Sequence, residues 1–149
     1  MRKWIVVLSV PLLALTSCST DKLGSAKNVK QIDVKVGEGI VKVGEDPALA
    51  DINRSAIQWV LEFGTVAAGY KFPAEGIVFD PNPVAVPVGC VKGDPVRAFH
   101  NCRPHSQGTV FQCDRRPNGF EPGACYKYTV TLTGVSGNPP PLDPWFKNQ

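Results

Sequence analysis

The sequence contains little that would mark an enzyme or a nucleic-acid-binding protein. Its formal charge is only +3 over 149 residues, which is too small to make a nucleic acid the expected partner. It has one methionine, no C-x-x-C pair of the kind that holds zinc, and no G-x-S-x-G nucleophile elbow. Its longest apolar run is shorter than the about 20 residues that a membrane-spanning helix needs. These absences predict a small domain without a catalytic motif.

Glycine and proline are abundant, with 14 residues of each. Hydrophobic residues make up 43% of the chain and charged residues 19%, which is typical of globular rather than disordered proteins. Because glycine and proline favour turns, this composition predicts short elements joined by many turns. The length suits a single domain.

The N-terminus has the parts of a secretory signal peptide. Arg2 and Lys3 precede an apolar run over residues 5–15, and small residues follow. The segment Leu15-Thr16-Ser17-Cys18 resembles the lipobox of bacterial prolipoproteins. This resemblance implies that residues 1–17 are removed and that the thiol of Cys18 receives a diacylglyceryl group. The alternative is an ordinary signal peptide cleaved nearby, with Cys18 incidental.

The lipobox resemblance also implies a location. In that family an aspartate directly after the cysteine favours retention in the inner membrane, whereas Ser19 and Thr20 stand there in this chain. We therefore expect an outer-membrane lipoprotein on the periplasmic face, held by two or three acyl chains, because a single chain binds only marginally. Residues 18–28 are expected to form the lipidated cysteine and a flexible tether, and residues 29–149 the domain.

Four further cysteines predict two disulfides, because exported proteins meet an oxidising compartment. They are Cys90, Cys102, Cys113 and Cys125. Three pairings are possible. We favour Cys90–Cys102 and Cys113–Cys125, since each bond would close a short loop between neighbouring strands.

Hydrophobic and polar residues alternate along several segments, which predicts β-strands. The predicted strands are residues 31–36, 39–43, 55–63, 71–79, 96–102, 109–113 and 126–132. In the third of these, Ile57, Trp59, Leu61 and Phe63 are expected on one buried face. A helix over residues 46–63 is the alternative there, because Asp46-Pro47 could begin one.

About seven short strands separated by turns predict an all-β fold, a single antiparallel immunoglobulin-like β-sandwich. Leu142, Trp145 and Phe146 are expected to dock on it, because an exposed pair of aromatic residues is unusual. The last strand and the tail, residues 126–132 and 142–148, resemble the end of small uncharacterised bacterial β-sandwich envelope proteins. This resemblance implies a fold and no activity.

The two histidines, His100 and His105, flank Cys102 and raise three chemical hypotheses. Two imidazoles and a thiolate match the blue-copper ligand set, although no methionine remains in the processed chain for the axial position. Zinc could be held by both histidines with Asp94 or Asp114. A nucleophilic Cys102 would need a free thiolate. We favour exposed histidines beside a structural disulfide, with no metal, no cofactor and no catalysis.

Basic side chains gather between residues 90 and 116, where Lys92 accompanies four arginines. We expect these arginines to contact acidic groups of a partner, because a guanidinium binds carboxylate or phosphate bidentately and disulfide-fixed loops lose little entropy on binding. They are Arg97, Arg103, Arg115 and Arg116. The alternative is an ordinary solvated face.

These features lead to one main functional hypothesis and two alternatives. The main hypothesis is a lipid-anchored binding or structural module of the bacterial envelope, without catalysis, whose partner is another envelope protein or the cell wall. The first alternative is an inhibitor that blocks a foreign hydrolase with its basic loops. The second is a metal-binding domain built on His100 and His105.

Overall fold

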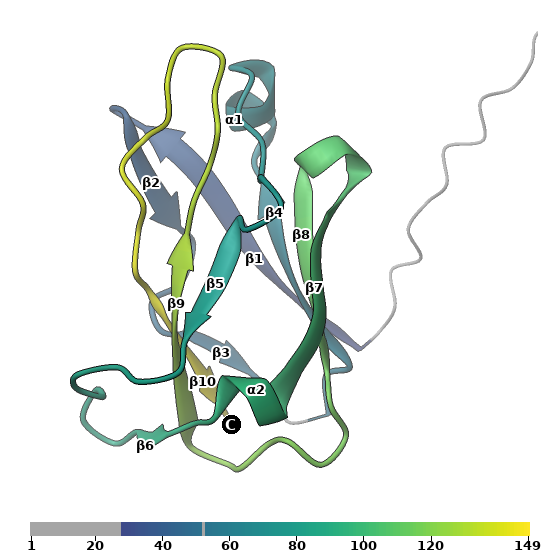
Figure 1. The fold of residues 1–149 in the computed structure, drawn as a ribbon, viewed down its shortest axis with the longest axis vertical. Coiled ribbons are helices and arrows are strands. Elements are labelled where there is room, and N and C mark those ends of the chain that lie inside the picture. Colours follow the sequence, from purple (N-terminus) through teal and green to yellow (C-terminus); the bar gives the residue numbers. More distant parts are fainter. Residues whose placement is uncertain (1–27, 52) are drawn as a thin grey trace, which may run out of the picture.

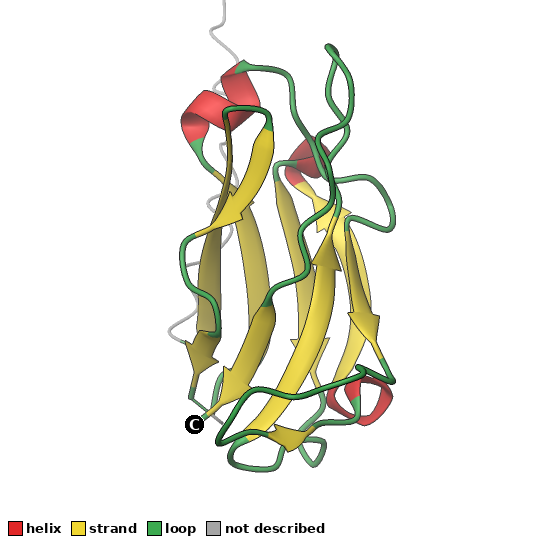
Figure 2. Cartoon of the chain, turned by 90° about the vertical axis from the view of Figure 1, so that its left-hand side faces the viewer, coloured by secondary structure: helices red, strands yellow, loops and turns green. Residues whose placement is uncertain are grey.

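The computed structural model describes residues 28–51 and 53–149, in which two β-sheets enclose one core (Figures 1 and 2). The order in the first sheet is β2 (Ile40–Val43), β1 (Val29–Gly37), β4 (Ala56–Leu61), β8 (Val110–Arg115) and β7 (Phe99–His105). The second contains β3 (Ala48–Ala50), β10 (Trp145–Asn148), β9 (Ala124–Val130) and β5 (Ile77–Asp80), with β6 (Val91–Lys92) also paired with β9. Short helical segments connect them: α1 (Phe63–Ala67), α2 (Pro95–Ala98) and the 3-10 turn η1 (Ser106–Gly108). The predicted signal peptide and Cys18 lie outside the described residues.

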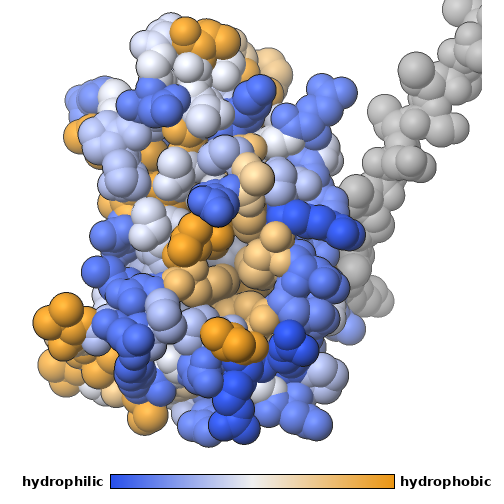
Figure 3. Space-filling view, viewed as in Figure 1, coloured by the Kyte–Doolittle hydropathy of each residue, from blue (hydrophilic) through white to orange (hydrophobic). Residues whose placement is uncertain are grey.

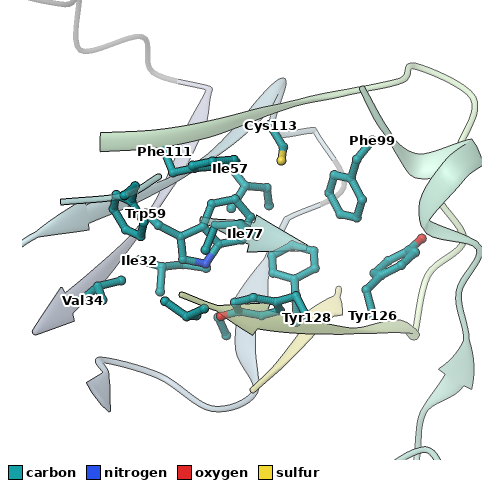
Figure 4. Packing of buried hydrophobic residues seen from close by; sticks show 14 of the residues in the cluster. Ile32, Val34, Ile57, Trp59, Ile77, Phe99, Phe111, Cys113, Tyr126 and Tyr128 are labelled. Atoms are coloured by element: carbon teal, nitrogen blue, oxygen red, sulfur yellow. The ribbon is translucent and has the colours of Figure 1, made fainter. Parts of the chain in front are cut away.

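Trp59 of β4 lies in the middle of the core, between the two sheets (Figure 4). Its ring contacts Phe111 of the neighbouring strand β8 edge-on, with the ring centroids 6.5 Å apart. Across the core it meets Tyr128 of β9, with a centroid separation of 5.3 Å. Edge-to-face contacts of this kind add to the free energy gained from burial. The aromatic cluster therefore ties the first sheet to the second.

The aromatic cluster continues toward α2. Phe79 of β5 stacks on Phe99 of β7, with the ring centroids 4.2 Å apart. Phe99 in turn meets Tyr126 and Phe146 edge-on. Because Phe99 directly follows α2, its packing fixes the position of this short helix against the core.

The prediction of a β-rich fold with two sheets and two disulfides is confirmed. The predicted period of two is seen in β9 from Tyr126 onward, where Tyr126, Tyr128 and Val130 are all buried. The tail docks as predicted: Phe146 is fully buried in β10, which pairs with β9. Leu142 packs against the core and Trp145 is half-buried.

The prediction that the sheets are wholly antiparallel is wrong. β1 and β4 run parallel, with Val29 opposite Ala56, and so do the pairs β3–β10 and β6–β9. Parallel neighbours need a long connection. The chain provides one here, since it leaves the first sheet after β2, adds β3 to the second sheet, and re-enters the first as β4.

The predicted strand over residues 55–63 ends early, at Leu61. Phe63 instead begins α1 and is 88% exposed, so its prediction as a core residue is wrong. The buried residue of this turn is Thr65, whose hydroxyl accepts a hydrogen bond from the backbone N–H of Val36 at 3.0 Å. This contact holds a helical turn against the end of β1. The alternative of one helix over residues 46–63 is also wrong, because this segment contains the strands β3 and β4.

The predicted strand over residues 96–102 begins late because α2 precedes it. Pro95 stands at the start of the helix, and Asp94 caps it by accepting a hydrogen bond from the N–H of Val96 at 3.0 Å. The strand therefore starts at Phe99. The predicted strand over residues 71–79 is likewise shorter, since β5 begins at Ile77.

All four predicted cysteines are in disulfides, but the favoured pairing is wrong. The bonds are Cys90–Cys125 and Cys102–Cys113. Cys102 and Cys113 lie on the paired strands β7 and β8, and Cys90 directly precedes β6, which pairs with β9 at Cys125. The favoured bonds would each have joined one sheet to the other. Both observed bonds therefore follow strand pairing, over a separation of 11 residues in one case and 35 in the other.

We expect Trp59→Ala to lower the free energy of unfolding by about 3–5 kcal/mol, because it removes the ring that both sheets contact. Urea denaturation of the oxidised protein, followed by circular dichroism, measures this loss. Phe63→Ala is the matched control and should change the free energy of unfolding by less than about 0.5 kcal/mol. Equal losses in the two variants would contradict the placement of these side chains.

Candidate functional site

The four arginines predicted to bind a partner are not all in one place. Arg97 on α2 and Arg116 directly after β8 line the same hollow. Arg103 is exposed on β7, where its Nε donates to Nε2 of His105 at 3.5 Å. Arg115 is buried. The structure therefore brings two of the four arginines together.

Arg115 holds the fold together and is not available to a partner, so its prediction as a binding residue is wrong. Its Nη1 donates to the carbonyl of Asp51 at 2.7 Å, and its Nη2 donates to Oδ1 of Asn148 at 2.8 Å. The guanidinium carbon lies 3.5 Å from the centre of the Phe120 ring. Burial lowers the pKa of Arg115 to about 10, although the neighbouring Tyr126 and Asp51 act to raise it.

Backbone contacts hold α2 against the loop of residues 116–121. The N–H of Arg116 donates to the carbonyl of Ala98 at 2.9 Å, next to Arg97. Gly119 lies so close to the carbonyl of Arg97 that a Cβ at this position would overlap it. The loop therefore needs a glycine here, and the close approach sets Arg97 and Arg116 beside each other.

A hollow of about 480 Å³ lies between α2 and this loop, and we call it the arginine hollow. Its lining residues are Val96, Arg97, His100, Arg116, Pro117, Asn118 and Gly119. No acidic side chain is among them. Nδ1 of His100 is buried and has no hydrogen-bond partner within the described residues. Two guanidinium groups, an imidazole and an amide suit a carboxylate or a phosphate.

A smaller hollow of about 230 Å³ lies on the other side of Arg97. Lys92 and Arg97 line it together with the acidic residues Asp94 and Glu121, so its charges are mixed. Gly93 lies against the ring of Tyr126, where a Cβ would overlap the ring. Because its cations face carboxylates, this hollow is a weaker candidate for an anion than the arginine hollow.

The two histidines and Cys102 do not form a ligand set. His100 and His105 are five residues apart on β7, roughly 15 Å along an extended strand. The sulfur of Cys102 is bonded to Cys113, so it offers no thiolate. Asp114 accepts hydrogen bonds from side-chain amides instead. Across residues 28–51 and 53–149, no three His, Cys, Asp or Glu side chains form a group that could hold a metal ion.

Five lining residues of the arginine hollow were not predicted as part of an anion site: Val96, His100, Pro117, Asn118 and Gly119. Pro117-Asn118-Gly119 is a turn signal in the sequence, so a loop could be expected there. That this loop packs on α2 depends on the pairing of β7 with β8, which places Phe99 opposite Arg115. The turn signal alone could not place the loop.

No protein-family model matches the chain, and no curated protein is significantly similar to it in sequence. Within the part of the chain that the structure describes, no helix is both long and apolar enough to span a bilayer.

We expect Arg115→Met to lower the free energy of unfolding by about 3 kcal/mol, because two hydrogen bonds from a charged donor are lost and the buried Oδ1 of Asn148 stays unpaired. Arg116→Met, one residue further along and exposed, is the control and should cost less than about 0.5 kcal/mol. Chemical denaturation of both variants measures the difference. A destabilised Arg116→Met beside an unaffected Arg115→Met would reverse the assignment of these two residues.

Proposed function

We propose that this protein is a lipid-anchored binding module of the bacterial envelope that works without catalysis. In this proposal the arginine hollow contacts an acidic group of a protein or cell-wall partner. The observation that carries it is the meeting of Arg97 and Arg116, from separate segments, in a hollow without any acidic lining residue. Like charges brought into one hollow favour the binding of an anion between or beside them, since two guanidinium groups repel each other.

The support beneath the arginine hollow favours a binding role. Arg97 lies just before β7 and Arg116 just after β8, and these two strands are paired and joined by the Cys102–Cys113 bond. A covalently fixed pair of strands holds the two arginines in place before a ligand arrives. Less conformational entropy is then lost on binding.

The proposed anchor is the lipidated Cys18, on the periplasmic face of the outer membrane. The lipobox segment and the leader before it support this proposal. The domain begins where Asn28 accepts a hydrogen bond from the N–H of Ser55, ten residues after Cys18. Such a segment spans at most about 35 Å. The anchor would therefore keep the domain close to the membrane surface.

We also propose that the two sheets form a variant of the immunoglobulin-like sandwich. A buried tryptophan at the centre of the core, Trp59, supports this, as it is a feature of such domains. The parallel pair β1–β4 and the placement of each disulfide within one sheet are departures from that architecture.

The lipid anchor predicts a modified N-terminus. Mass spectrometry of the chain extracted from bacterial membranes should find acyl groups on Cys18 as the first residue, because the lipobox directs both modification and cleavage. Cys18→Ser is expected to carry no acyl group while keeping both disulfides. An unmodified chain that begins at another residue would contradict the anchor.

The arginine hollow predicts a charge-dependent interaction. The double variant R97Q/R116Q should bind its partner about tenfold less, because each of the two substitutions removes a charged hydrogen-bond donor. The measurement is the fraction of protein that sediments with isolated cell-wall sacculi or that cross-links to an envelope protein. Raising the salt concentration should weaken the wild-type interaction in the same way. R103Q, which neutralises an exposed arginine outside the hollow, is the control. Equal losses in R103Q and R97Q/R116Q would contradict the site.

A further inference from the structure

A strongly apolar loop projects from the end of the domain that carries α2. It comprises residues 81–90, between β5 and β6, and we call it the valine loop. Val84 and Val88 are fully exposed in it, and Val86 is 38% exposed. Figure 3 shows a hydrophobic cluster projecting at the lower left, where Figure 1 places the connection from β5 to β6. A cluster of exposed aliphatic side chains is typical of a surface that binds an apolar partner.

The base of the valine loop is firmly held. Cys90 is bonded to Cys125, and Oδ1 of Asp80 accepts a hydrogen bond from the N–H of Asn82 at 2.8 Å. The Nζ of Lys92 donates to Oδ1 of Asn82 at 3.1 Å. Lys147 likewise donates from its Nζ to the carbonyl of Gly89 at 3.1 Å. The valines are therefore presented on a fixed support that contacts two lysines.

We infer that the valine loop inserts into the phospholipid surface of the membrane that carries the anchor. Val84 and Val88 would enter the apolar edge of the bilayer, and Lys92 and Lys147 would meet lipid phosphates. This inference rests on the proposed function in one respect, since the lipid on Cys18 brings the domain to the membrane. It adds a second contact that orients the domain.

The charges around the loop favour a lipid surface. Lys92 and Lys147 stand at its base and can reach lipid phosphates. Of the nearby carboxylates, those of Asp80 and Asp94 each accept a hydrogen bond from a backbone N–H, and that of Glu121 lines the smaller hollow together with Lys92. Basic residues next to a membrane surface add to the attraction of anionic lipids. When the apolar tip of the loop enters the acyl region, the lysines at its base lie at the level of the lipid phosphates.

The position of β1 gives a second reason. In Figure 1 β1 begins in the lower half of the domain, as the valine loop does, although on the opposite side, and both lie away from α1 at the upper end. A tether of ten residues, at most about 35 Å long, holds this half near the acyl chains. The loop can therefore reach the bilayer while the anchor is inserted.

The composition of the valine loop argues against a protein partner. Binding energy at protein interfaces is concentrated in tryptophan, tyrosine and arginine. Residues 81–90 contain none of these and consist largely of valine and proline. Burial of valines in lipid needs no complementary pocket, because hydrophobic transfer is not directional. The small apolar area suits a contact that assists an anchor rather than replaces one.

The test is the lipidated full chain, processed in bacteria and added to vesicles of phosphatidylethanolamine and phosphatidylglycerol with brominated acyl chains. V84W places a fluorescent reporter at the loop tip, and V135W places one at the opposite end, on a valine that is 85% exposed. Trp59 and Trp145 contribute equally to both variants, so wild-type emission is subtracted. We expect the brominated lipid to remove most of the added emission of V84W and to leave that of V135W unchanged.

The other outcomes separate the loop from the anchor. If the chains float with the vesicles but V84W and V135W are quenched equally, the inference about the loop is overturned and the anchor stands. If the wild-type chain does not float, the anchor fails and this contact with it. If V84W is unquenched by lipid but becomes shielded from acrylamide when a purified envelope protein is added, the loop is a protein interface, and the inference is wrong.

Discussion

The pairing of β7 with β8 is the constraint on which the candidate site depends. α2 leads into β7 and the loop of residues 116–121 leads out of β8, so the ladder brings both to one end of the domain. The Cys102–Cys113 bond joins the same two strands, and the stack of Phe99 on Phe79 fixes the start of β7 in the core. The arginine hollow is therefore a consequence of strand register rather than of the loops alone.

Much of the sheet structure could be predicted from the sequence because one face of each strand is buried. Where a local polar signal competes with this period, the sequence is ambiguous. Asp46-Pro47 and Asp94-Pro95 are the same dipeptide, yet only the second begins a helix. Asp94 accepts from its own helix at Val96, whereas Asp46 accepts from the distant N–H of Trp145 at 2.9 Å. The hydrogen-bond partner of Asp46 comes from the other end of the chain, so no local sequence pattern could show that a helix does not begin there.

The site was predictable only in part, for a similar reason. The sequence shows that basic residues gather between Cys90 and Arg116, but their charge alone does not tell which of them are exposed to solvent. For Arg115 the period of two does tell. Phe111 and Cys113 of β8 are buried, and Arg115 follows them on the same inward face. Arg116, beyond the strand, is exposed. An arginine in step with buried residues is better interpreted as a structural residue than as a ligand-binding one.

The valine loop and the arginine hollow are neighbours, and this relates the two proposals. Residues Pro81, Asn82, Lys92, Gly93 and Asp94 line a hollow between the loop and α2, and the last three also line the smaller hollow beside Arg97. A domain that rests on the bilayer through its valines would therefore hold Arg97 and Arg116 close to the membrane surface. An acidic group that reaches the arginine hollow would then belong to a partner lying along that surface, because the anchor, the loop and the hollow restrict how far the site can turn away from it.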